Sequence, residues 1–374
     1  MILNKFLNES VYDINDSMIV EASNEGFTFE DGGMARAISL AETEMTKLEM
    51  ADMVTEAKAV QLIVKGRMNN LSESAIMEEV NMLQENVLTN TWEKIKQIAM
   101  KLWARIKAII ESALTWITKT FNKSAFIKTA RKQLEKYTDF EDLDFEGYEY
   151  DYKAVEADKA FAIASKCIED KFKELDSKHN INSKSSKEDI AAAKDALEEI
   201  KSESFKDEIA GSIIDGASYT DFKSKVVEKM KGDKKSLTFD KNAALTRIDN
   251  EGKIKTQINA IKTKVDNAFR QAIAEMGKEE KEAKKIKDKA NTDEQPFATF
   301  AYQTLVASSS LLNVALTLSS EVSDAALTII KEETKQTLNF VSAALSKGRK
   351  NHVKASNEST DLGGSFLDSI LAEI

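Results

Sequence analysis

The chain has 374 residues, of which 42% are hydrophobic and 31% are charged, so it is long enough to bury a substantial core. Its single proline, Pro296, and its 13 glycines leave few helix-breaking residues, which favours long helices and disfavours a compact α/β enzyme. Residues 1–90 hold 16 acidic and 6 basic side chains and so carry the whole net charge of −10; this argues against nucleic acid as the main partner, because phosphate binding needs clustered Lys and Arg.

The N-terminal third is expected to pass from an irregular segment into helices. In residues 1–33, short apolar clusters alternate with Asn, Asp, Ser and Gly, which is typical of loops. Helical patterns follow over 34–67 and 71–86. Residues 91–121 form the clearest amphipathic helix, with apolar side chains every three or four positions and lysines opposite. A basic amphipathic helix also suits a membrane surface or a partner groove, but we expect it to pack in a bundle.

The middle of the chain mixes helices with a region that permits two short strands. The alternation of Tyr148, Tyr150 and Tyr152 permits a strand that would pair with residues 236–239. The carboxylates of 141–151 do not have the spacing of a Ca²⁺-binding loop, so no metal site is expected there.

Helices are expected on both sides of the second strand. One covers 153–180, and two or three shorter ones cover 187–231 with a break near Gly216. A long helix is expected over about 243–289, with Ile and Val at heptad spacing in its first part.

A final long helix is expected over about 298–347, followed by a polar tail. Residues 295–320 contain no charged side chain, and this length could span a bilayer. Their Ser, Thr, Asn and Gln content favours instead a helix that is buried inside a bundle.

These patterns predict a mainly α protein: an elongated bundle of long helices, with a small two-stranded β insertion near 145–152 and 236–240. Five consecutive regions are expected: an irregular N-terminal tail or propeptide (1–33), an N-terminal helical region (34–136), a middle α region with the short strands (137–242), a long-helix hairpin (243–348) and a C-terminal tail (349–374).

Few residues are suited to catalysis. His179 and His352 are the only histidines and Cys167 is the only cysteine, so Ser-His or Cys-His pairs and zinc sites have few candidates. Glycine-rich phosphate loops are absent from the sequence. We therefore expect no enzymatic activity, no metal and no cofactor, and a lone cysteine agrees with a reducing cytosol.

The two ends of the chain carry the most specific pattern. The pentad ASNEG at 22–26 recurs as ASNES at 355–359. Near the start, Leu or Ile also stands two positions before Glu9 and Glu21, and a small residue follows each of them. Because proteases cut at exposed junctions between a tail and a folded body, the pattern indicates processing sites.

This pattern resembles the targeting segments of internal head proteins in large contractile-tailed phages. The resemblance implies that a short N-terminal segment carries the protein into the prohead, and that a maturation protease cuts after Glu in Leu/Ile-x-Glu or Ser/Ala-x-Glu patterns. It covers residues 1–26 and 355–359 and does not cover the helical body. The matching bonds are Glu9–Ser10, Glu21–Ala22, Glu25–Gly26 and Glu358–Ser359.

The resemblance implies a non-enzymatic virion structural or prohead core protein, made in the bacterial host cytoplasm and located in the virion. Its partners would be other virion or capsid proteins, with self-association through helix packing; nucleic acid is not favoured. The alternative is a membrane-active or pore-forming helical protein that would use residues 91–121 and 295–320.

Overall fold

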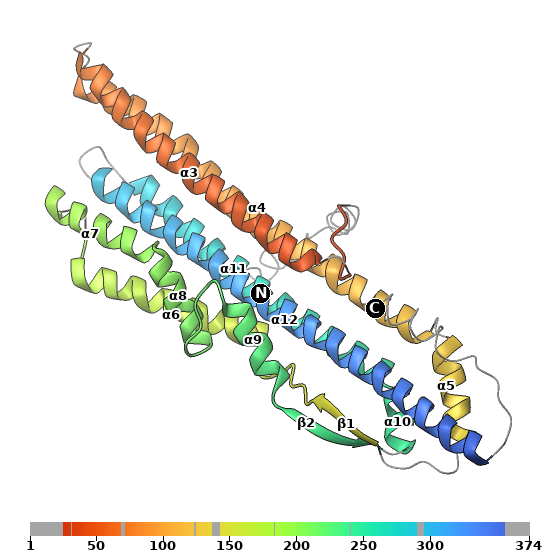
Figure 1. The fold of residues 1–374 in the computed structure, drawn as a ribbon. Helices are drawn as coiled ribbons and strands as arrows, with labels where there is room; N and C mark the ends of the chain where they lie inside the picture. Colours follow the sequence, from red (N-terminus) through yellow and green to blue (C-terminus); the bar gives the residue numbers. More distant parts are fainter. Residues whose placement is uncertain are drawn as a thin grey trace, which may run out of the picture. The chain divides into compact units, whose positions relative to one another are not determined.

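The computed structural model describes residues 25–30, 32–68, 72–122, 125–136, 143–182, 184–239, 241–289 and 295–355. Within these residues the protein is mainly α with one pair of strands, which confirms the predicted fold class (Figure 1). The helices are α3 (Gly33–Met68), α4 (Glu73–Asn122), α5 (Ala125–Lys136), α6 (Ala157–His179), α7 (Lys187–Ile200), α8 (Glu203–Ile213), α9 (Phe222–Lys231), α10 (Lys241–Ile248), α11 (Glu251–Lys289) and α12 (Gln295–Ala355).

The contacts between residues divide the chain into two compact units. The first unit comprises the chain up to Ile109, Ala157–Phe222 and Val265–Glu321, and the second comprises the remaining stretches. Helices α4, α11 and α12 contribute residues to both units. Each unit is thus assembled from separate stretches, whereas the five regions expected from the sequence are consecutive.

The core of the first unit includes the amphipathic face that the sequence indicated in α4. Ile95, Ile98 and Leu102 are all at most 6% exposed. Trp103 stacks on Phe269 of α11 with ring centroids 5.7 Å apart, so α4 packs against α11. The expected break near residue 86 was wrong, because α4 runs unbroken from Glu73 to Asn122.

The shorter helices of the first unit begin and end where local hydrogen bonds stop the helical ladder. Asn180 follows α6 with a positive φ of 45°, and its amide donates to the carbonyl of Asp176 (2.7 Å), a left-handed C-terminal cap. Ser186 and Asp189 form a reciprocal capping box at the start of α7. Helices α7 and α8, together with α9, which lies in the second unit from Lys223 onward, confirm the two or three shorter helices expected over 187–231.

Helix α11 carries the predicted heptad seam on its buried side. Ile254, Ile258 and Val265 are each 1% exposed. The expected single helix over 243–289 is instead divided into α10 and α11 at residues 249–250. This break falls on an Asp-Asn pair, whose side chains compete for backbone hydrogen bonds.

Helix α12 satisfies several of its buried polar side chains within the helix. The hydroxyl of Ser320 donates to the carbonyl of Leu316 (2.6 Å), and the amide of Asn313 donates to the carbonyl of Ser309 (3.2 Å). Such bonds remove most of the cost of burying a polar group. This is how a helix so rich in Ser, Thr and Asn can occupy a core.

The second unit contains the two-stranded antiparallel sheet, β1 (Leu143–Tyr148) with β2 (Lys234–Phe239). The predicted pairing of the two segments is confirmed, but β1 lies earlier than the Tyr148–Tyr152 alternation suggested. Tyr148 pairs with Lys234, the first residue of β2, so the ladder cannot continue beyond it. Gln336 of α12 then holds the Tyr148 backbone, accepting from its amide at 2.9 Å and donating to its carbonyl at 3.1 Å.

Glu279 of α11 is a partly buried carboxylate that predicts a pH dependence of stability. Burial raises its pKa, the neighbouring Glu275 adds to this, and hydrogen bonds from the Ser308 and Ser309 hydroxyls oppose it. A pKa raised in the folded state means that the ionised form costs stability above that pKa, and that stability rises as pH falls through it.

Glu279→Gln is therefore expected to be more stable than the wild type at pH 7, by about 1 kcal/mol or less, with the difference shrinking toward pH 4. Urea unfolding of both proteins at pH 7 and at pH 4 measures this difference in stability. The matched control is Glu93→Gln on the exposed surface of α4, which should change the stability at pH 7 by less than about 0.5 kcal/mol. A Glu279→Gln protein that is less stable at pH 7 would contradict the expectation.

Candidate functional site

The residues that precede α3 form a compact junction between the N-terminal segment and the helical body. Phe27 is 2% exposed, although it lies in a segment expected to be irregular. Two guanidinium groups lie over its ring: the Arg36 Cζ is 4.5 Å and the Arg105 Cζ 5.0 Å from the ring centroid. Both distances fall within the range of cation–π attraction. We refer to Glu25, Gly26, Phe27, Arg36 and Arg105 as the Phe27 latch.

The same two arginines also hold the polar groups of the junction. Arg36 Nη2 donates to the carbonyl oxygens of Glu25 (2.9 Å) and Gly26 (2.8 Å). Arg105 Nε lies 3.6 Å from Glu25 Oε2, and the Arg105 side chain is only 11% exposed. Its Nη2 is 3.9 Å from Glu44 Oε1 of α3, so α3 and α4 are tied together beside the latch.

Two glycines allow the chain to close onto the start of α3. Gly26 has a φ of +76°, which L side chains rarely adopt. At Gly33, the amide donates to the Thr28 carbonyl (3.0 Å), and a Cβ would stand 2.4 Å from that oxygen. The turn over residues 25–28 is therefore built against the first turn of α3 and depends on a missing side chain there.

One of the predicted cleavage bonds lies in the latch, namely Glu25–Gly26. The other predicted cleavage residues lie outside the described part of the chain: Glu9, Ser10, Glu21, Ala22, Glu358 and Ser359. The described chain ends at Ala355, the last residue of α12 and the first residue of the second pentad.

The arginines of the latch are what sequence reasoning missed. Arg36 could be found from its position in the first turn of a helix directly after the predicted turn. Arg105 lies 80 residues after Glu25 in the chain, and nothing in the local pattern links the two. Phe27 was recognised only as part of an apolar cluster.

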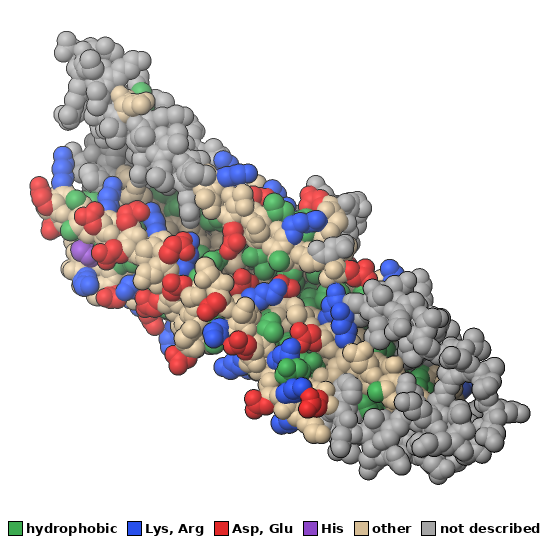
Figure 2. Space-filling model, viewed as in Figure 1, with side chains coloured by type: hydrophobic (Ala, Val, Ile, Leu, Met, Phe, Trp, Pro, Cys, Tyr) green, Lys and Arg blue, Asp and Glu red, His purple; other side chains and the backbone are tan. Residues whose placement is uncertain are grey.

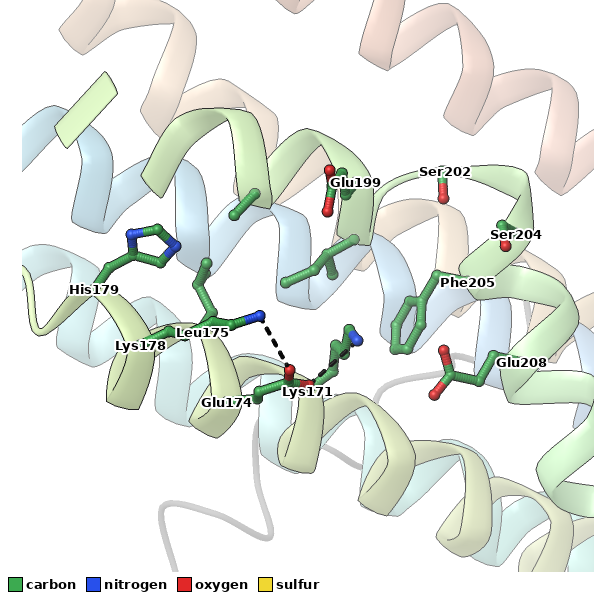
Figure 3. A pocket seen from close by; sticks show the side chains of 12 residues that line it. Lys171, Glu174, Leu175, Lys178, His179, Glu199, Ser202, Ser204, Phe205 and Glu208 are labelled. Atoms are coloured by element: carbon green, nitrogen blue, oxygen red, sulfur yellow. Dashed lines mark hydrogen bonds and ion pairs between the residues drawn. The ribbon is translucent and has the colours of Figure 1, made fainter. Parts of the chain in front are cut away.

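A groove of about 680 Å³ lies between α6, α7 and α8 (Figure 3). Leu175, Ile200 and Phe205 supply apolar lining. Glu174 lies beside two lysines of the same helix, 3.3 Å from Lys171 and 3.5 Å from Lys178. The groove therefore combines apolar surface with paired charges.

The residues with metal-binding chemistry do not cluster within the described chain. No group of three or more His, Cys, Asp or Glu side chains is placed there to hold a metal ion. Burial and the nearby Glu208 carboxylate raise the pKa of the Cys167 thiol, which disfavours the reactive thiolate. His179 lies at the end of α6 among the residues that line the groove.

Among the residues that the structure describes, one helix is long and apolar enough to cross a membrane by length and composition. It covers Thr299–Leu345 within α12; an 18-residue window of this stretch has a mean hydropathy of 1.3, and 67% of that window is buried inside the structure. Core helices of globular proteins have the same properties. The burial agrees with the expected bundle helix.

No protein-family model matches the chain, and no curated protein or solved structure matches it. The fold and the latch are therefore interpreted from the residues of this chain alone. Function is inferred from three features of the chain itself: the latch, the helix packing and the repeated terminal pattern.

Proposed function

We propose that the protein is a non-enzymatic virion structural protein of the internal head, or prohead core, type, trimmed at its ends by a maturation protease. One observation carries the proposal: the two copies of the pentad border the described helical body. The first copy ends at Gly26, next to the buried Phe27, and the second begins at Ala355, where α12 ends. Cuts after Glu25 and Glu358 would remove both tails and leave every described helix whole.

The helical body supports a structural role. Its long helices bury continuous apolar seams, and such helices stack and self-associate readily. On the face shown in Figure 2, acidic and basic side chains are interspersed, without a basic patch of the kind that nucleic acid requires. Other copies of the chain and other virion proteins are the partners that this surface favours.

Composition of purified particles tests the proposal. Peptides from residues 157–222 are expected to co-sediment with the capsid protein through two density gradients, and to remain after a salt wash and nuclease treatment. An unrelated protein of the same host is added to the lysate before purification, as a control for non-specific co-sedimentation with the particles. Recovery of the chain only in the unassembled fraction would contradict the proposal.

A membrane-active role is the alternative, favoured by the composition of Thr299–Leu345. It requires α12 to leave a core in which Leu316 and Ile329 have no exposed surface. Dye release from anionic lipid vesicles at pH 7 and pH 4.5 distinguishes the two roles. Release at low protein concentration would favour the alternative, and intact vesicles at both pH values would remove it.

A further inference from the structure

We infer that the Phe27 latch protects the Glu25–Gly26 bond, so that this bond is cut only after the latch opens. The inference deepens the proposed function and rests on it for its biological meaning. Its physical content is separate, because it concerns how the folded chain presents one peptide bond to any protease that recognises glutamate.

A protease that cuts after Glu must engage the Glu25 side chain. In the folded chain this carboxylate already lies beside the buried guanidinium of Arg105, at 3.6 Å. The Glu25 side chain is 45% exposed, so exposure alone would suggest an accessible site. Its charge, however, is neutralised by a cation that a protease would have to displace.

The protease must also polarise the carbonyl of the bond that it breaks, through donors that it aims at that oxygen. The carbonyl of Glu25 already accepts a hydrogen bond from Arg36 Nη2 (2.9 Å), and the next carbonyl, of Gly26, accepts from the same atom (2.8 Å). The Arg36 guanidinium therefore already binds the carbonyl oxygens of both Glu25 and Gly26.

The backbone of the junction has the wrong shape for cleavage. A substrate strand is bound in extended form, pairing its main chain with the enzyme. Gly26 instead adopts a φ of +76°. The side chain of Phe27, two residues after the cut, is 2% exposed and in contact with two arginines, so it cannot enter a protease subsite without leaving them.

The Glu25 side chain, the Glu25 carbonyl and the Phe27 side chain thus all make contacts with the folded body. Cleavage then follows the small fraction of molecules in which residues 25–27 have opened. The cut itself costs the body little, because Arg105 keeps its contact with Glu44 and Phe27 stays on the body side of the bond. Opening of the latch therefore determines when the Glu25–Gly26 bond is cut. The contacts of Arg105 with Glu44 and Phe27 do not depend on that bond once it has been cut.

Digestion of the full chain with a glutamate-specific endoprotease tests the latch directly. The rate of appearance of the fragment that begins at Gly26 is followed by mass spectrometry, beside a synthetic peptide covering residues 19–32. We expect the bond in the folded chain to be cut at least about 100-fold more slowly than the same bond in the peptide. Equal rates would overturn the inference.

Variants separate the latch from general stability. Phe27→Ala and Arg36→Gln should each raise the rate at Glu25–Gly26 by about tenfold or more, and Phe27→Tyr should stay near the wild-type rate. Ile168→Ala is the matched control, because Ile168 is 2% exposed in α6 and its loss weakens the core without touching the latch. An unchanged rate in Phe27→Ala, or an equal rise in Ile168→Ala, would refute the latch.

This digest needs no phage particle, so its outcome is independent of the proposed function. A protected bond in the purified chain with untrimmed protein in particles would refute trimming and keep the latch. Rapid cleavage of the bond in the purified chain, together with trimmed protein in particles, would refute the latch and keep trimming. Circular dichroism of each variant confirms that it is folded before digestion.

Discussion

Trp103→Ala is expected to destabilise the protein by about 3–5 kcal/mol, because it removes a large buried aromatic ring from the first unit. Trp103 is 3% exposed, stacks on Phe269, and donates from Nε1 to Asp266 Oδ1 at 2.8 Å. Lys107 also lies over the indole ring, 4.4 Å from its centroid. The measurement is urea unfolding followed by circular dichroism at 222 nm.

Trp103→Phe is the matched control, since it keeps an aromatic ring but removes the indole donor. We expect it to cost about 1–2 kcal/mol. Asp266 would retain Lys107, whose Nζ lies 3.4 Å from Oδ1, so no buried charge is left unpaired. If Trp103→Ala and Trp103→Phe lowered the free energy of unfolding equally, the aromatic packing of α4 on α11 would not be a major contribution to stability.

Gly33→Ala is expected to open the turn before α3, with a local cost of about 2 kcal/mol or more. The added Cβ would lie 2.4 Å from the Thr28 carbonyl oxygen and 2.8 Å from the Thr28 nitrogen, so the backbone of the turn has to move. The amide of Gly33 bonds to that carbonyl, and its hydrogen exchange reports the opening directly. We expect that exchange to accelerate by about tenfold or more.

Gly252→Ala provides the comparison for this glycine. Gly252 lies in the first turn of α11 with nothing within 4 Å of an added Cβ, so alanine should stabilise the helix by about 0.5 kcal/mol or less. The two substitutions add the same methyl group and should act in opposite directions. A neutral Gly33→Ala with normal exchange at Gly33 would show that the turn does not need a glycine there.

Much of the fold follows from spacing and composition. The helical periods of 34–67, 153–180 and 187–231 predict α3, α6 and the group α7–α9, because each buries one face at a period of 3.6. The paired strands were anticipated from the alternation of Tyr148, Tyr150 and Tyr152 and from the segment 236–239. These are signals that local side-chain patterns carry within single elements.

The errors occur where neighbouring elements decide the boundary. Asn86 and Asn90 would weaken an isolated helix, yet α4 continues through both. At 249–250 the reverse holds, since a short Asp-Asn break divides what the heptad pattern joined. The strand β1 ends at Tyr148 because β2 begins at Lys234, a limit set by a residue far away in the chain.

The candidate site was only partly predictable for the same reason. Glutamate followed by a small residue marks Glu25–Gly26 in the sequence, but the sequence does not reveal that the bond is held. That depends on Arg105, which α4 brings beside Glu25 and Phe27. A local motif can thus identify a cleavable bond, whereas its protection depends on contacts between distant parts of the chain.

Terminal peptide mapping of the protein from purified phage particles tests whether both ends are trimmed. We expect the chain to begin at Ser10, Ala22 or Gly26 and to end at Glu358. A start at Ala22 would mean that the latch stayed closed, and a start at Gly26 that it opened during maturation. Particles that contain the chain with both Met1 and Ile374 in place would contradict the claim.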